Sequence, residues 1–178
     1  MVLTASGDPI VSDGTGGGVY RVVGDSLRLL NGRDFISPQT PAMVSDDDHV
    51  LVPDYARGVG LMDLRTGHVT WLDRGAGDRV ALNGIDGLYV YRQSMILTQN
   101  GTAPERVARV KLDPTHTRTI STDIVEQATP TLGDPTHGVV VGDTFYYIAN
   151  SGWQAIDEHG EVKAGATVTA PRIMRVHL

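Results

Sequence analysis

Four short apolar segments, each ending in an aspartate or asparagine, recur along the chain. They occupy residues 10–13, 51–54, 97–100 and 147–150, so their last residues are 41, 46 and 50 positions apart. Each segment has the length and composition of a β-strand, and helical periodicity is nowhere sustained. The pattern therefore predicts an all-β protein built from repeats.

The similarity between the repeats extends beyond the closing residue. A glycine-containing loop follows each closing residue, and a second strand is predicted after it, at residues 19–22, 60–64, 107–112 and 153–156. When the second repeat is shifted back by 41 residues, its turn at 46–49 lies over a turn at 5–8. Both turns have the polar composition of a tight hairpin. A repeat of about 40–50 residues is the length of a four-stranded propeller blade.

We therefore predict a β-propeller of four-stranded antiparallel blades. The blades cover approximately residues 1–33, 34–80, 81–130 and 131–178. The first of them begins inside an inner strand, and residues 172–178 are predicted to form the last strand. The alternative is a β-sandwich or barrel with evenly spaced hairpins, although such folds do not usually keep one motif through four repeats.

Composition limits the partners that such a fold could have. Fifteen basic and 21 acidic residues give a net charge of −6, which supplies no attraction to nucleic acid or to anionic lipid. No apolar run is long enough to cross a bilayer, so we expect neither nucleic acid nor a membrane as a partner. Cysteine is absent, which excludes disulfides and thiolate chemistry but is compatible with any compartment.

Several of the repeat motifs resemble one known family. The stretches 41–55, 84–88, 99–101 and 134–151 are similar to the group that contains senescence marker protein, gluconolactonase and luciferin-regenerating enzyme. This resemblance implies a propeller of about six blades, of which about four are visible here, with the pattern truncated at the amino terminus. It also implies a metal-dependent hydrolase of lactones or small esters. The family holds a divalent cation (calcium, zinc or manganese) with one Glu, two Asn and one Asp.

The resemblance assigns site residues at the start of successive inner strands. Asp86, in the motif Asp-Gly-Leu, matches the metal-binding aspartate of the family. Thr40 lies one repeat earlier, where the family has asparagine, and Thr136 lies one repeat later with His137 beside it. The glutamate would precede residue 1. A threonine hydroxyl is a weaker cation ligand than an amide carbonyl.

Other polar residues are candidates for lining a small-molecule site around this axis. His137 could act as a general base, and Asp54, Asn100 and Asn150 end strands on the same side as Asp86. Each has a structural alternative. The closing residues could instead accept hydrogen bonds from loop amides, Asp86 before a glycine suits a turn, and a single histidine in a loop often has no special role.

Two functions follow from these residues. One is the metal-dependent hydrolase, and the other is a non-catalytic propeller that binds a small molecule or a peptide at the mouth of its channel. The incomplete set of blades gives a further expectation. An arc of four blades leaves an apolar face open at each end, so the chain should self-associate through those faces, aggregate, or close into a strained ring by joining strands 2–5 and 172–177.

Overall fold

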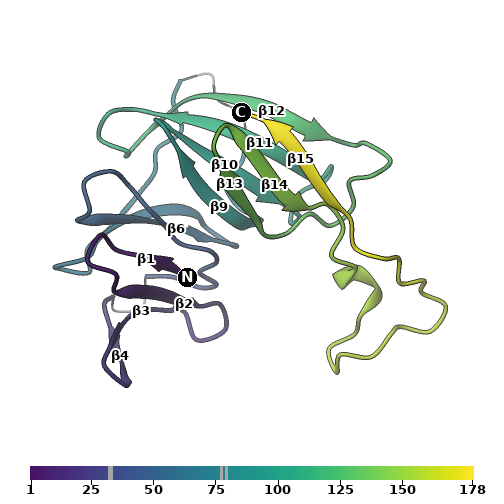
Figure 1. The fold of residues 1–178 in the computed structure, drawn as a ribbon, viewed down its shortest axis with the longest axis horizontal. Coiled ribbons are helices and arrows are strands. Elements are labelled where there is room, and N and C mark those ends of the chain that lie inside the picture. Colours follow the sequence, from purple (N-terminus) through teal and green to yellow (C-terminus); the bar gives the residue numbers. More distant parts are fainter. Residues whose placement is uncertain (32–33, 77, 79) are drawn as a thin grey trace.

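The computed structural model describes every residue except 32–33, 77 and 79. The predicted blade boundary at residue 33 lies outside the described residues. The chain forms four antiparallel sheets in consecutive stretches of sequence, arranged as the blades of a β-propeller (Figure 1). The predicted all-β propeller class is confirmed.

Three of the sheets have four strands, and the fourth has three. The first sheet contains β1 (Val2–Leu3), β2 (Pro9–Asp13), β3 (Gly18–Val23) and β4 (Ser26–Leu29). The second contains β5 (Ala42–Met43), β6 (His49–Asp54), β7 (Gly58–Asp63) and β8 (Val69–Trp71). The third contains β9 (Ile85–Tyr91), β10 (Ser94–Gln99), β11 (Arg106–Leu112) and β12 (Thr119–Gln127). The fourth contains β13 (Gly138–Val141), β14 (Thr144–Ile148) and β15 (Ile173–His177).

The core consists of three apolar layers, each between two neighbouring sheets. Ile10 and Val19 of the first sheet pack with Val50 and Met62 of the second. A second layer joins the second and third sheets, and a third layer, which includes Phe145, joins the third and fourth. Because β10 lies between two strands of its own sheet and has a neighbouring sheet on each side, all six of its residues are buried. Each inner sheet is thus stabilised on both faces.

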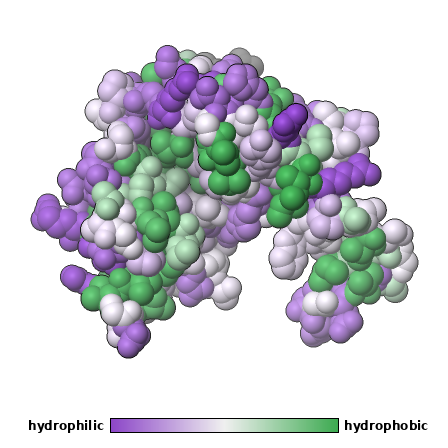
Figure 2. Space-filling view, in the orientation of Figure 1, coloured by the Kyte–Doolittle hydropathy of each residue, from purple (hydrophilic) through white to green (hydrophobic). Residues whose placement is uncertain are grey.

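The two end sheets each have one uncovered face. Inner strands of consecutive sheets contact one another, from β1 to β5, β5 to β9 and β9 to β13, and among the described residues no strand pairing joins the first sheet to the fourth. Hydrophobic side chains gather over the first sheet and over β13–β15 (Figure 2). The expected ring closure does not occur, because β1 pairs with β2 in the first sheet and β15 pairs with β14 in the fourth.

The fourth sheet differs from the repeat in its third strand. Residues 153–156 were predicted to be a strand, but this prediction is wrong: they contain a single 3₁₀ turn, η1 (Trp153–Ala155), preceded by Gly152 in the left-handed conformation. The predicted terminal strand is present as β15 and takes the third place in the sheet. Residues 149–172 form a long excursion between β14 and β15, seen at the lower right of Figure 1. In the described part of the chain, no helix is long and apolar enough to cross a membrane.

Candidate functional site

Three side chains meet where the inner strands of the second, third and fourth sheets begin. Asp86 is the second residue of β9, and Thr40 and Thr136 precede β5 and β13. The Thr40 hydroxyl donates to the Asp86 carbonyl at 3.0 Å, and the Thr136 hydroxyl donates to Oδ2 of Asp86. The predicted residues at equivalent repeat positions are therefore brought together, and they connect three blades.

The Asp86 carboxylate is fixed by a second contact on the same oxygen. The Asn100 amide donates to Oδ2 of Asp86 at 3.3 Å, and the Tyr55 hydroxyl in turn donates to Oδ1 of Asn100 at 3.0 Å. Oδ1 of Asp86 accepts no hydrogen bond from the described residues. A fully buried oxygen without a partner would be an unsatisfied polar atom, and Oδ1 of Asp86 is not one of these. That oxygen is therefore accessible to solvent or to a ligand.

His137 joins the same cluster through one ring nitrogen. Its Nδ1 lies 3.1 Å from Oγ1 of Thr40. Because the Thr40 hydroxyl donates to the Asp86 carbonyl, its oxygen can accept a hydrogen bond from Nδ1. The other ring nitrogen, Nε2, takes no part in this contact.

A cavity of about 510 Å³ opens beside this cluster, and we call it the mouth cavity. It is lined by Gln39, Asp86, Thr136, His137, Ile148, Ser151, Trp153 and Pro171. Its volume lies within the range of small-molecule sites, about 300–1,000 Å³. Its polar lining comes from Gln39 before β5, Asp86 in β9, Thr136 and His137 before β13, and Ser151 after β14, and its apolar lining comes from Ile148, Trp153 and Pro171.

The surroundings of the mouth cavity are negatively charged. The pKa of Tyr55 is raised, first by burial and then by the charges of Asp86, Asp134 and Glu105. Asp134 is buried, its carboxylate accepts a hydrogen bond from the Ser151 hydroxyl, and its backbone nitrogen donates to the carboxylate of Glu105. None of the described residues that line the cavity is lysine or arginine. The cavity is therefore suited to neutral or cationic ligands.

Two of the predicted lining residues support loops instead. Asp54 is fully buried, and its carboxylate accepts hydrogen bonds from the backbone nitrogens of four residues, Ile36, Ser37, Ala56 and Arg57. The Asn150 side chain forms hydrogen bonds with the segment that precedes β15, at Thr169, Ala170 and Arg172. Neither residue lines the mouth cavity, and we do not assign a ligand to either.

The side chains in the cluster do not fit the divalent cation that the family resemblance implies. Among the described residues no three acidic or histidine side chains are grouped as a metal site. Oδ2 of Asp86 faces the Thr136 hydroxyl and the Asn100 amide nitrogen, both of which are donors. A cation requires oxygen acceptors at these positions, so the cluster as arranged lacks the ligand set of a divalent cation site.

Sequence reasoning missed several residues of this site. Tyr55 and Ser151 directly follow the closing residues Asp54 and Asn150, and that repeat position could have identified them. Trp153 was assigned to a strand. Gln39 and Glu105 carried no signal in the repeat pattern.

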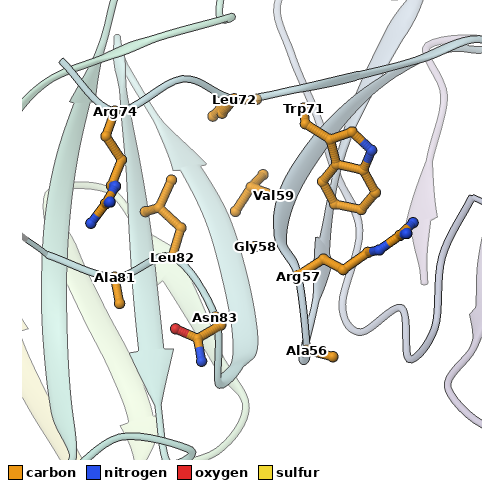
Figure 3. A pocket seen from close by; sticks show the side chains of 10 residues that line it. All are labelled: Ala56, Arg57, Gly58, Val59, Trp71, Leu72, Arg74, Ala81, Leu82 and Asn83. Atoms are coloured by element: carbon orange, nitrogen blue, oxygen red, sulfur yellow. The ribbon is translucent and has the colours of Figure 1, made fainter.

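A second cavity, of about 650 Å³, lies between β7, β8 and the segment before β9 (Figure 3). Val59, Leu72 and Leu82 point into it, and the guanidinium of Arg57 lies 5.5 Å from the centre of the Trp71 ring. This cavity contains none of the residues predicted from the sequence. Its lining residues come from the second sheet and the segment before β9, whereas residues of three blades meet beside the mouth cavity.

The fold and the site place the protein in the β-propeller class, and solved structures agree. No protein-family model and no curated protein match the sequence. Hydrazine synthase from Kuenenia stuttgartiensis is similar over 98% of this chain and 48% of its own, with a TM-score of 0.62 and 14% identity. The PQQ-bound aldose sugar dehydrogenase from Streptomyces coelicolor matches over 90% of this chain and 52% of its own, with a TM-score of 0.60 and 12% identity.

A luciferin-regenerating enzyme is also similar, over 90% of this chain and 51% of its own, with a TM-score of 0.54 and 12% identity. The chain thus spans about half the length of these structures. At such identities the likeness shows the propeller fold, and function must be argued from the site.

Proposed function

We propose that the protein binds a small polar molecule in the mouth cavity. The observation that supports this proposal is the position of the Asp86 carboxylate, which contacts from other blades hold at the cavity wall while one oxygen remains accessible. A carboxylate oxygen accepts hydrogen bonds from ligand hydroxyl or amine groups. Because hydrogen bonds already fix Asp86 and His137, little ordering of the site is needed on binding.

Replacement of Asp86 with asparagine tests this proposal. Ligand-observed NMR with a panel of small polyols, sugars and amines is expected to detect binders of the unmodified protein. We expect Asp86→Asn to weaken them at least about tenfold, because a hydrogen bond to a charged group contributes roughly 1.5–3 kcal/mol. Asp13→Asn is the matched control, since Asp13 is exposed in the first sheet and contacts only its own loop. Equal binding by both variants, or no binder in the panel, would contradict the proposal.

Hydrolysis of a lactone or small ester is a second candidate function, and the position of His137 favours it. His137 lines the mouth cavity, and its Nδ1 contacts Thr40. As a general base, its other nitrogen, Nε2, could take a proton from a water that attacks a bound carbonyl. The sequence resemblance to gluconolactonase supports the same substrate class.

A metal titration tests the cation that this resemblance implies. Isothermal titration calorimetry with Ca²⁺, Mn²⁺ or Zn²⁺ is expected to show weak binding or none, because the contacts of Asp86 are with donor groups. Binding with a Kd below about 1 μM, in the range of evolved cation sites, that disappears in Asp86→Ala would show that the cluster rearranges into a metal centre.

A further inference from the structure

Trp153 is a large aromatic residue whose side chain is mostly exposed to solvent. It is the first residue of η1, two-thirds of its surface is exposed (66%), and it lines the mouth cavity together with Asp86. Large aromatic side chains are usually covered in a folded protein and are frequent where a ligand or partner binds. The indole is therefore a candidate ligand contact.

Hydrogen bonds connect the turn that carries Trp153 to the rest of the site. The Gln154 side chain donates to Oε1 of Glu105 at 2.8 Å, and Glu105 belongs to the loop before β11 in the third sheet. The backbone nitrogen of Trp153 lies 3.4 Å from Oγ of Ser151, and Ser151 contacts Asp134. These contacts join η1 to Glu105 and, through Ser151, to Asp134, so Trp153 is exposed in an anchored segment.

Three carboxylates are connected to the cavity that the indole lines. Asp86 lines the same cavity, and the carboxylates of Glu105 and Asp134 are joined to η1 and to Ser151. Lys163 donates to the Gln154 carbonyl on the same turn, but it is not among the described residues that line the cavity. A carboxylate and an exposed indole in one cavity, without a lysine or arginine in its wall, form an environment that attracts a cation.

We propose that the mouth cavity binds an organic cation, with its alkylammonium group between the Trp153 indole and the Asp86 carboxylate. This inference rests on the proposed small-molecule function and names its ligand class. The face of an indole carries negative electrostatic potential that attracts ammonium groups. The carboxylate provides the opposite charge, and Ile148 and Pro171 provide an apolar wall for the methyl or methylene groups.

Choline and 3,3-dimethyl-1-butanol are the probes, because they have nearly the same shape and differ in charge. The chain has two tryptophans, so Trp71→Phe leaves Trp153 as the only indole fluorophore. We expect choline to change Trp153 fluorescence saturably, and the neutral alcohol to bind at least about tenfold more weakly. Calorimetry on the unmodified protein repeats the comparison independently of the Trp71 replacement.

Two variants complete the test. Trp153→Leu and Asp86→Asn are each expected to weaken choline binding by about tenfold, while Lys163→Met leaves it unchanged or slightly stronger. Equal binding of choline and the neutral alcohol would overturn the cation inference and leave the small-molecule function standing. The same holds if choline does not bind but a neutral member of the NMR panel does. Failure of the whole panel, choline included, would overturn both.

Discussion

Replacing Asp54 with alanine is expected to lower the free energy of unfolding by about 3 kcal/mol or more. Asp54 has no exposed surface, and its two carboxylate oxygens accept four backbone hydrogen bonds. Two of the donors belong to the loop before β5 and two to the turn between β6 and β7. Alanine would remove the common acceptor of four partly buried hydrogen bonds that join the two loops, and a hydrogen bond to a charged group contributes about 1.5–3 kcal/mol.

The repeat supplies a matched control for this substitution. Asp13 holds the same repeat position in the first sheet, but it is exposed and accepts hydrogen bonds only from Thr15 and Gly16. Because water can replace those contacts, Asp13→Ala is expected to cost about 1 kcal/mol or less. Urea denaturation followed by circular dichroism measures both values. If both variants lowered the free energy of unfolding by a similar amount, the buried hydrogen bonds of Asp54 would not be the reason for its contribution to stability.

The 178-residue chain by itself is expected to self-associate through the open faces of its first and fourth sheets. Leu3, Leu27 and Leu29 lie on the uncovered side of the first sheet and are each about half exposed or more. Val139, Val141 and Ile173 lie on the uncovered side of the fourth. If each face exposes roughly 400 Å² of apolar surface, covering it contributes on the order of 10 kcal/mol before the costs of association. We propose a second copy of the chain as the occupant.

Charge substitutions on both faces test this expectation. The double variant Leu27→Lys, Ile173→Lys is expected to convert a concentration-dependent dimer or larger assembly into a monomer, because each lysine would have to lose its hydration in the interface. Sedimentation velocity at several concentrations measures the change. Ile120→Lys, on the outer strand β12 where the side chain is also half exposed, is the control and should leave the assembly intact. A monomeric unmodified protein at high concentration would contradict the proposal.

The repeat pattern predicted the propeller class because blades depend on local sequence. Alternating apolar positions, hairpin turns and the interval between closing residues all act within about 50 residues. The same register predicted that Thr40, Asp86 and Thr136 meet. Equivalent positions in consecutive blades are related by rotation about one axis, so residues that align in sequence converge in space. The roles of these residues in binding remain the predictions tested above.

The sequence could not distinguish residues that share one repeat position. Asp54 and Asn100 both close a second strand, yet Asp54 accepts four loop amides in the interior and Asn100 contacts Asp86 at the cavity. The difference depends on which loop of another segment packs against each side chain. The excursion at 149–172 is a similar case. Its length interrupts the repeat, and only contacts such as that of Gln154 with Glu105 place Trp153 at the cavity. Strands, their order and the convergence of equivalent repeat positions thus follow from local periodicity, whereas the role of each side chain depends on which loop packs against it, which no local pattern encodes.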